Sequence, residues 1–166
     1  MADTPDRAHD DTLDAPWLDD DEMEAWLAMI RMMARLPGAL DRQLRRDADL
    51  TAFEYQVLVG LSEADGHCLR MSELAAFTEG ALPRLSQVAA RLEQRGMITR
   101  GPDPDDGRYT QAVLTDAGMA KLVTSAPGHV ATVRRLVFDP LTRAQVRQLR
   151  DISQRIGRSL DDEPGC

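Results

Sequence analysis

Residues 71–118 read MSELAAFTEG ALPRLSQVAA RLEQRGMITR GPDPDDGRYT QAVLTDAG, and this stretch decides the fold. Its first part predicts a brief helix over 73–77, with Ser72 as the N-cap residue. Glu79-Gly80 then turns the chain, and a second helix is predicted over about 82–95. Two helices joined by so tight a turn are typical of a helix-turn-helix.

The second predicted helix has two chemically different faces. Its apolar residues recur at helical spacing and form a stripe that we expect to be buried, made of Leu82, Leu85, Val88, Ala89 and Leu92. The opposite face carries Arg84, Ser86, Gln87, Arg91, Gln94 and Arg95. This face suits the major groove of DNA, because Arg84 can fork to guanine, Gln87 can bond adenine, and the later arginines can meet phosphates. Taken alone, the same pattern would equally suit a solvated helix.

A proline and a glycine mark the two ends of this second helix, and a predicted β-hairpin follows it. Pro83 lies in the first turn, where its missing N–H costs no hydrogen bond, and Gly96 ends the helix. Residues 97–100 and 109–114 are predicted strands, joined by a turn-rich loop in which Asp106-Gly107 is a hairpin signal. The order of helix, turn, amphipathic helix and hairpin predicts a winged helix-turn-helix.

Two helices are predicted before this stretch. Asp19 and Glu22 form a capping pair for the first, with a kink or break expected at Pro37-Gly38. The apolar residues at helical spacing in this first helix are Trp26, Ile30, Met33 and Leu40. Residues 51–54 form a capping box that opens the second helix.

The residues that follow the hairpin predict two more helices. Thr115 caps a long helix that runs to about Phe138 and is interrupted at Pro127-Gly128. Residues 142–145 form another capping box, which opens a final amphipathic helix. Ahead of the decisive stretch, residues 68–70 read as a short extended piece.

A winged core is complete at about residue 115. The apolar stripes of the first and last helices therefore need another surface to bury them, and a second copy of the chain is the simplest candidate. The predicted fold class is mainly α with a small β-hairpin wing, a winged helix-turn-helix core flanked by N- and C-terminal dimerisation helices. The predicted division is a disordered acidic tail at 1–16, an N-terminal dimerisation helix region at 17–50, a DNA-binding lobe at 51–115, C-terminal dimerisation helices at 116–160 and a tail at 161–166.

The net charge of −8 does not count against a nucleic-acid partner, because the acids gather at one end. Residues 1–24 hold ten acidic residues and one base, which leaves 18 acids and 19 bases in the other 142 residues. With 43% hydrophobic and 29% charged residues, the composition is that of a globular protein. No apolar run approaches the ~20 residues of a bilayer span and no signal peptide is visible, so we expect a cytoplasmic protein with no membrane partner.

The sequence contains no recognisable catalytic or cofactor-binding motif. There is no nucleophile elbow, phosphate-binding loop, glycine-rich dinucleotide loop or paired acid and base, so we expect no enzyme and no cofactor. The three histidines, together with Cys68 and Cys166, lack the spacing of metal ligands. Cys68 could be a peroxide-sensing thiol, but its place in a short strand favours a small structural residue.

The chain resembles the multiple-antibiotic-resistance regulator (MarR) family of bacterial transcription factors from about residue 17 to residue 160. The motifs that carry the resemblance, in family order and spacing, are MSELA at 71–75, RLEQRGMI at 91–98, DPDDGR at 103–108 and LTDAG at 114–118. The resemblance implies a dimer whose recognition helices enter successive major grooves of a pseudo-palindromic operator, while the wings reach flanking minor grooves. It also implies that small molecules, often aromatic acids or antibiotics, relieve DNA binding.

The family pattern assigns roles to individual positions. It makes 82–95 the recognition helix, Arg108 the wing-tip arginine and Asp106 the acid that braces it. The chain departs from the pattern in two places. The residues at 81–84, Ala-Leu-Pro-Arg, replace the common Ser-x-Ser-Thr, and Gly107 stands where a second wing arginine is common. The base preference of relatives therefore does not transfer to this chain.

Together these features predict a dimeric, sequence-specific regulator, a repressor relieved by a small aromatic or phenolic ligand. The alternative is a protein-interaction module whose winged helix no longer binds DNA. The ligand pocket is predicted between the first helix and the start of the second, mostly apolar with one arginine for a carboxylate. Its predicted lining is Trp26, Ile30, Met33, Tyr55 and either Arg45 or Arg46. The alternative for the apolar members is that they are core alone.

Overall fold

The computed structural model describes residues 17–162, which form two compact units divided between Arg35 and Leu36. Helix α1, Asp20–Ala48, contributes residues to both units. The predicted tail at 1–16 and the last four residues of the chain lie outside the described residues. The first position of the predicted C-terminal tail, Asp161, still belongs to a helix.

The first unit consists of the residues up to Arg35 and begins with the predicted helix cap. The backbone N–H of Glu22 donates to Asp19 Oδ1 at 2.8 Å, and that of Asp19 donates to Glu22 Oε2 at 3.0 Å. Several large apolar side chains of this part of α1 are exposed in the single chain: Met23, Trp26, Leu27, Ile30, Met32 and Met33. Trp26, Ile30 and Met33 of the predicted apolar stripe therefore have no covering surface in their own unit, while the fourth member, Leu40, is half-buried in the second unit.

Neither helix breaks at its proline, so the interruption predicted at Pro127-Gly128 is wrong, as is the break that was one of the two outcomes expected at Pro37-Gly38. Helix α1 continues through Pro37, and helix α5, Asp116–Val133, continues through Pro127. A proline inside a helix removes the hydrogen bond to the carbonyl four residues earlier. The carbonyls that lose a partner belong to Met33 and Val123, and both residues lie on exposed stretches of their helices.

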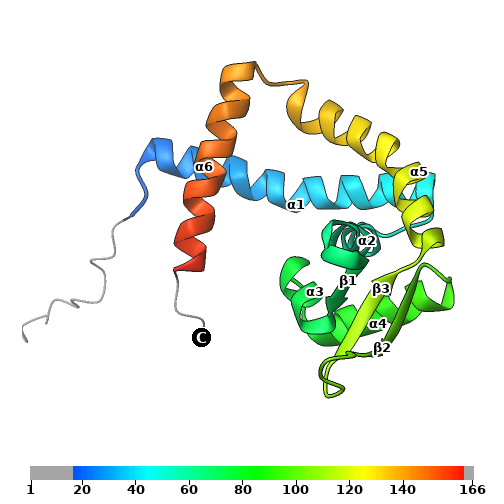
Figure 1. Cartoon of the computed structure of the whole chain (residues 1–166). Coiled ribbons are helices and arrows are strands. Elements are labelled where there is room, and N and C mark those ends of the chain that lie inside the picture. Colours follow the sequence, from blue (N-terminus) through cyan, green and yellow to red (C-terminus); the bar gives the residue numbers. More distant parts are fainter. Residues whose placement is uncertain (1–16, 163–166) are drawn as a thin grey trace, which may run out of the picture. The chain divides into compact units, whose positions relative to one another are not determined.

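The second unit contains the winged helix-turn-helix that the sequence predicts. Its three strands form one antiparallel sheet in the order β1-β3-β2, in which Leu69 and Arg100 flank Ala112 (Figure 1). The elements of this lobe are α2 (Ala52–Glu63), β1 (Cys68–Arg70), α3 (Met71–Phe77), α4 (Leu82–Gln94), β2 (Ile98–Pro102) and β3 (Thr110–Leu114). Helices α2 and α4 both pack on this sheet and on each other.

The core of the lobe lies between these helices and the sheet. Its fully buried side chains are Leu44, Leu50, Val57, Leu58, Leu61, Leu74, Leu85, Leu92 and Ile98. Burying one side chain of this size stabilises a fold by roughly 1.5–3 kcal/mol. Four of the five residues predicted for the buried stripe of α4 are buried, but Leu82 is 48% exposed. It is the first residue of the helix, one turn short of the part that reaches the core.

The ends of the two central helices differ in how well the sequence predicted them. Helix α3 begins at Met71, so the predicted Ser72 cap is wrong, and the Glu73 carboxylate instead accepts from the Arg70 N–H at 2.9 Å. Helix α4 ends as predicted, because Gly96 has φ of 72° and Met97 N–H donates back to the Leu92 carbonyl.

The C-terminal part leaves more apolar surface uncovered. After α5, a π-helical segment, Arg134–Phe138, leads to α6, Arg143–Asp161, which opens at the predicted Thr142 capping box. Helix α6 contains no buried residue, and it exposes Ile152, Ile156 and Leu160. In the described part of the chain, no helix is long and apolar enough to cross a membrane.

Candidate nucleic-acid interface

The packing of α4 determines which of its side chains face outward. Because Leu85, Val88, Ala89 and Leu92 are buried in the lobe, the predicted reading residues Arg84, Ser86 and Gln87 are exposed on the opposite face. The Arg84 guanidinium lies 4.3 Å from the centre of the Phe53 ring, a cation–π contact that steadies the side chain. The sequence did not predict this partner on α2.

The two later arginines of the recognition helix turn toward the corner between α1 and α2. Arg91 Nε lies 3.7 Å from Glu54 Oε1, and Arg95 Nη1 lies 3.8 Å from the same oxygen. Arg95 Nη2 also donates to the carbonyl of Asp49 at 2.7 Å and to its side chain at 3.1 Å. The phosphate contacts predicted for both arginines stay a prediction, and the acids around them could not be read from the helix alone.

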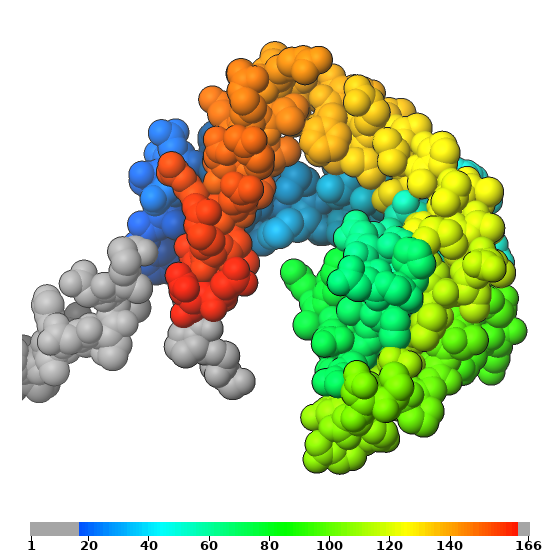
Figure 2. All heavy atoms as spheres, viewed as in Figure 1, coloured from blue at the N-terminus to red at the C-terminus, as the bar shows by residue number. Residues whose placement is uncertain are grey.

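The loop between β2 and β3 is the wing, and it projects from the lobe (Figure 2). At its tip, Arg108 pairs with Asp106 through Nη2 at 2.6 Å and Nε at 2.9 Å, so the expected brace is present. The hydrogen bond from Arg108 holds the pKa of the Asp106 carboxyl below its usual range. The Arg108 side chain remains 83% exposed, so its guanidinium is accessible to a partner.

The wing turn is built around Asp103, which sequence reasoning did not single out. Its side chain is 8% exposed and accepts from Arg70 Nε at 2.5 Å and from the N–H groups of Asp105 and Asp106 at 2.9 and 3.3 Å. Gly107 is not among the described residues with positive φ, so the turn differs from the primed hairpin suggested by Asp106-Gly107. The detectable signal was Asp103-Pro104, an acid before a proline in a turn-rich loop.

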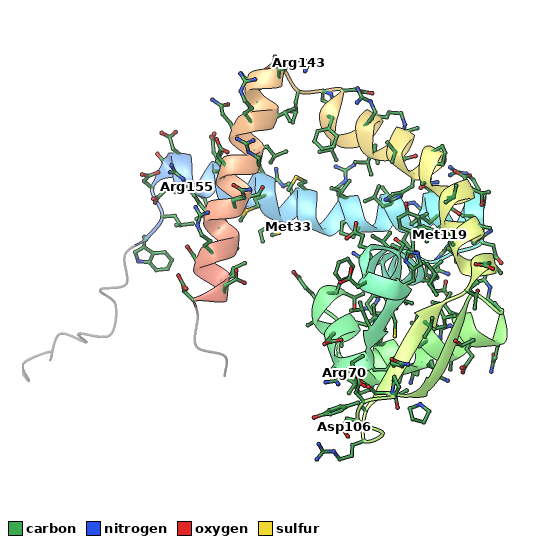
Figure 3. All side chains as sticks on the ribbon, viewed as in Figure 1. Met33, Arg70, Asp106, Met119, Arg143 and Arg155 are labelled. Atoms are coloured by element: carbon green, nitrogen blue, oxygen red, sulfur yellow. The ribbon has the colours of Figure 1, made fainter. Side chains whose placement is uncertain are left out.

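Arg70 connects the wing to the body of the lobe. Besides its bond to Asp103, its guanidinium lies 4.8 Å from the centre of the Tyr109 ring. Figure 3 shows Arg70 and Asp106 at the same end of the lobe. Because Arg70 ends β1 and Asp103 follows β2, this ion pair ties the base of the wing to the opposite edge of the sheet.

We predict that Asp103→Asn loosens the wing at neutral pH without unfolding the lobe. Hydrogen bonds from Arg70 and from the backbone of Asp105 lower the pKa of Asp103, so the ionised form contributes stability above its unfolded pKa of about 3.9. That contribution is lost as the pH falls through the lowered folded pKa. In hydrogen exchange, the amides of Asp105 and Asp106 should exchange roughly tenfold faster in the variant, because asparagine loses the ion pair with Arg70 and offers these amides a neutral, weaker acceptor.

The control for this experiment is Asp105→Asn, a neighbouring acid whose side chain holds no hydrogen bond to any described residue. Wild type should approach the exchange rates of Asp103→Asn as the solution is acidified, after correction for intrinsic exchange. Equal protection of the wing in all three proteins at neutral pH would contradict the role given to Asp103.

Cys68 has the surroundings of a structural residue. Its Sγ donates to Gln111 Oε1 at 3.0 Å, and burial together with the nearby Asp103 and Glu73 carboxylates raises the pKa of the thiol. A raised pKa opposes the thiolate that a peroxide sensor needs. Cys166 lies outside the described residues. Within residues 17–162, no three His, Cys, Asp or Glu side chains gather as metal ligands would.

The residues of the predicted ligand pocket belong to both units. Trp26, Ile30 and Met33 are exposed in the first unit. In the second, Arg45 pairs with Asp41 at 2.6 Å and Arg46 with Asp47 at 2.7 Å. The Tyr55 ring packs 4.6 Å from the His129 ring. The pocket itself stays a prediction.

The chain is similar to known transcriptional regulators, both in the winged lobe and over most of its length. A family model described as MarR family matches residues 48–108. The chain is 40% identical to Sco3205, a MarR family transcriptional regulator from Streptomyces coelicolor solved in complex with DNA, over 92% of this chain and 96% of that one, with a TM-score of 0.85. It is 26% identical to the HTH-type transcriptional repressor IacR of Pseudomonas putida, over 82% of this chain and 78% of the relative.

A third relative was solved with a small molecule. CouR from Rhodococcus jostii RHA1, bound to p-coumaroyl-CoA, is 25% identical over 82% of this chain and 92% of that one, with a TM-score of 0.66. Sco3205 and IacR are named as transcriptional regulators rather than as enzymes. The similarity to Sco3205 spans nearly the whole of both chains and includes the winged lobe with its recognition helix and wing, so the chain belongs to the MarR family of transcriptional regulators.

Proposed function

We propose that the protein is a homodimeric, cytoplasmic repressor that binds a pseudo-palindromic DNA operator and is released from it by a small aromatic or phenolic ligand. The observation that carries the DNA-binding part is the outward polar face of α4 beside a braced and exposed wing arginine. The proposed DNA-binding residues are Arg84, Ser86, Gln87, Arg91, Arg95, Asp106 and Arg108. The repressor assignment is supported by the name of IacR.

The chemistry of these residues divides between the two grooves. Arg84 and Gln87 suit guanine and adenine edges in the major groove, where each base pair shows a distinct pattern of donors and acceptors. Arg108 suits a narrow, A·T-rich minor groove, whose negative potential attracts a guanidinium. The relative Sco3205 was solved with DNA, which supports the same partner here.

The uncovered apolar side chains support a dimer. The first unit exposes Trp26, Leu27 and Ile30, and the second exposes Ile152 and Ile156 on α6. Large apolar stripes of this kind mark protein interfaces. A second copy of the chain brings an identical set of stripes, which is what a symmetric dimer requires.

We expect the full-length protein to sediment as a dimer and to select a two-fold symmetric motif from a random DNA library. Its half-sites should lie about one helical turn, ~10 bp, apart, since each recognition helix takes one major groove. A stable monomer would contradict the dimer. If no sequence is selected while the dimer persists, the alternative function as a protein-interaction module gains support.

For the ligand, we expect salicylate or a phenolic acid to weaken operator binding. A ligand acts only if it binds the DNA-incompetent form more tightly than the competent one, and a wedge between dimerisation helices and lobe can change the half-site spacing. CouR, solved with p-coumaroyl-CoA, supports an aromatic ligand. Trp26→Ala should blunt the response more than it lowers DNA affinity.

Operator titrations with and without ligand, for wild type and Trp26→Ala, measure this effect. Trp17→Ala is the matched control, because it removes another exposed tryptophan outside the predicted pocket. Unchanged affinity across a panel of aromatic acids would make the regulator independent of such ligands.

A further inference from the structure

A polar cavity of about 370 Å³ lies in the second unit, where α1 ends, α2 begins and α4 makes its last turn. It is lined by Arg45, Asp49, Leu50, Thr51, Glu54, Arg91 and Arg95. Of the residues in the predicted aromatic pocket, it includes Arg45 and no other. Its lining suits a charged group rather than an apolar ring.

Glu54 positions two of the arginines without satisfying them. Its carboxylate is 6% exposed, and Oε2 already accepts from the Thr51 N–H at 2.7 Å as part of a helix cap. The other oxygen lies 3.7 and 3.8 Å from Arg91 and Arg95, beyond the length of a good hydrogen bond. The acid therefore attracts both guanidinium groups while leaving their N–H donors available.

The three guanidinium groups retain unused donors. Arg91 donates no hydrogen bond to any residue that the structure describes, and Arg45 uses its Nε for Asp41. Arg95 uses Nη2 for Asp49. Each guanidinium carries five N–H donors, so most of them remain for a further acceptor. The lining holds three positive and two negative side chains, and Asp41, which pairs with Arg45, balances the third arginine, so the attraction for an anion comes from the unused N–H donors.

We propose that this cavity is a binding site for one phosphate group. Guanidinium groups bind phosphate through paired, charge-assisted hydrogen bonds, and a tetrahedral phosphate can accept from several directions at once. Three arginines from two helices match that geometry better than they match a planar carboxylate. The volume leaves room for the atoms that carry the phosphate.

Such a phosphate has two sources, the backbone of duplex DNA and a free phosphorylated molecule. The DNA source rests on the proposed function and would make Arg45 an anchor of the operator complex outside the recognition helix and wing. The free molecule would act at the end of α4, where Arg95 ties the recognition helix to the α1–α2 corner. The experiment below has one arm for each source.

The DNA arm measures the affinity of the full-length protein for its selected duplex over a range of salt concentrations. Arg45→Ala should weaken binding and reduce the slope of log K against log salt by about 0.9, the value for one lost phosphate contact. Arg42→Ala is the control, because this arginine lies one turn earlier on the same helix, is exposed and does not line the cavity. Its slope should equal that of wild type.

The second arm omits DNA and follows inorganic phosphate by ³¹P NMR in chloride buffer of matched ionic strength. If the site takes a free phosphate, the resonance should broaden with wild type and Arg42→Ala but not with Arg45→Ala. Thermal unfolding of each variant checks that the lobe is intact, since Arg45 is exposed and outside the apolar core.

The outcomes separate the site from the function. An Arg45-dependent salt slope assigns the site to the DNA backbone, and Arg45-dependent broadening without a slope change assigns it to a free phosphorylated molecule. If wild type selects DNA but Arg45→Ala changes neither readout, the phosphate site is overturned while the proposed function stands. If wild type selects no DNA, the proposed function fails and the NMR arm alone decides the site.

Discussion

Gly118→Ala is expected to destabilise the protein by about 3 kcal/mol, the upper part of the range for overpacked sites. A Cβ at this position would lie 2.0 Å from the Met97 carbonyl oxygen and 2.7 Å from Leu114 Cδ1. The carbonyl cannot move aside cheaply, because it also accepts from the Thr115 N–H at 3.1 Å. Gly118 thus allows the start of α5 to lie against Met97, the residue just before β2.

Urea unfolding followed by circular dichroism measures this effect. Gly128→Ala is the control in the same helix, since its Cβ would meet Gln43 at an ordinary 3.6 Å. That substitution should be neutral or stabilise by up to about 1 kcal/mol, the helix preference of alanine over glycine. An unchanged midpoint for Gly118→Ala would mean that the close approach of α5 to Met97 does not exist in solution.

The sequence predicted the features that depend on residues close together along the chain. The capping boxes at Thr51 and Thr142 each join a side chain to a backbone N–H three residues away. Four consecutive residues are therefore enough to predict each one. Position 96 has a positive φ, and a glycine that directly follows an amphipathic helix pattern predicts such a conformation. For the same reason, the order of helices and strands in the lobe was predictable.

Features that depend on distant partners were missed. Asp103 lies 33 positions from Arg70, and Asp49 lies 46 positions from Arg95. The residues next to each partner in the sequence therefore do not predict these contacts. The helix breaks expected at the two prolines were wrong, because whether a helix continues past a proline depends on the packing of the folded chain as well as on the residues beside it. The reading face was predicted, but the acids that hold its later arginines were not.

Gln87→Ala and Arg108→Ala are expected to alter DNA binding in different ways. Gln87 is exposed on α4, on the side away from the buried Leu85 and Val88, so we expect its amide to meet a base edge in a major groove. A paired contact of glutamine with adenine is worth about 1–3 kcal/mol of discrimination, or roughly 5- to 150-fold. Its loss should flatten the preference at one or two positions of the selected motif and leave the rest unchanged.

Arg108 should act through groove shape rather than base identity. Its guanidinium is braced by Asp106 at the tip of the wing, and a minor groove offers a guanidinium a potential that depends on width more than on sequence. Its removal should weaken binding broadly and leave the motif in the major groove unchanged. Selecting sites from a random library with each variant distinguishes the two effects.

The matched control for the first variant is Gln94→Ala. Gln94 is an exposed glutamine two turns further along the same face of α4, so it tests whether any amide on this helix matters or only the one near its start. Gln94→Ala should reproduce the wild-type motif. Identical motif changes in Gln87→Ala and Arg108→Ala would mean that helix and wing do not divide the grooves between them, because a side chain that reads a base edge and one that senses groove width cannot alter the same positions in the same way.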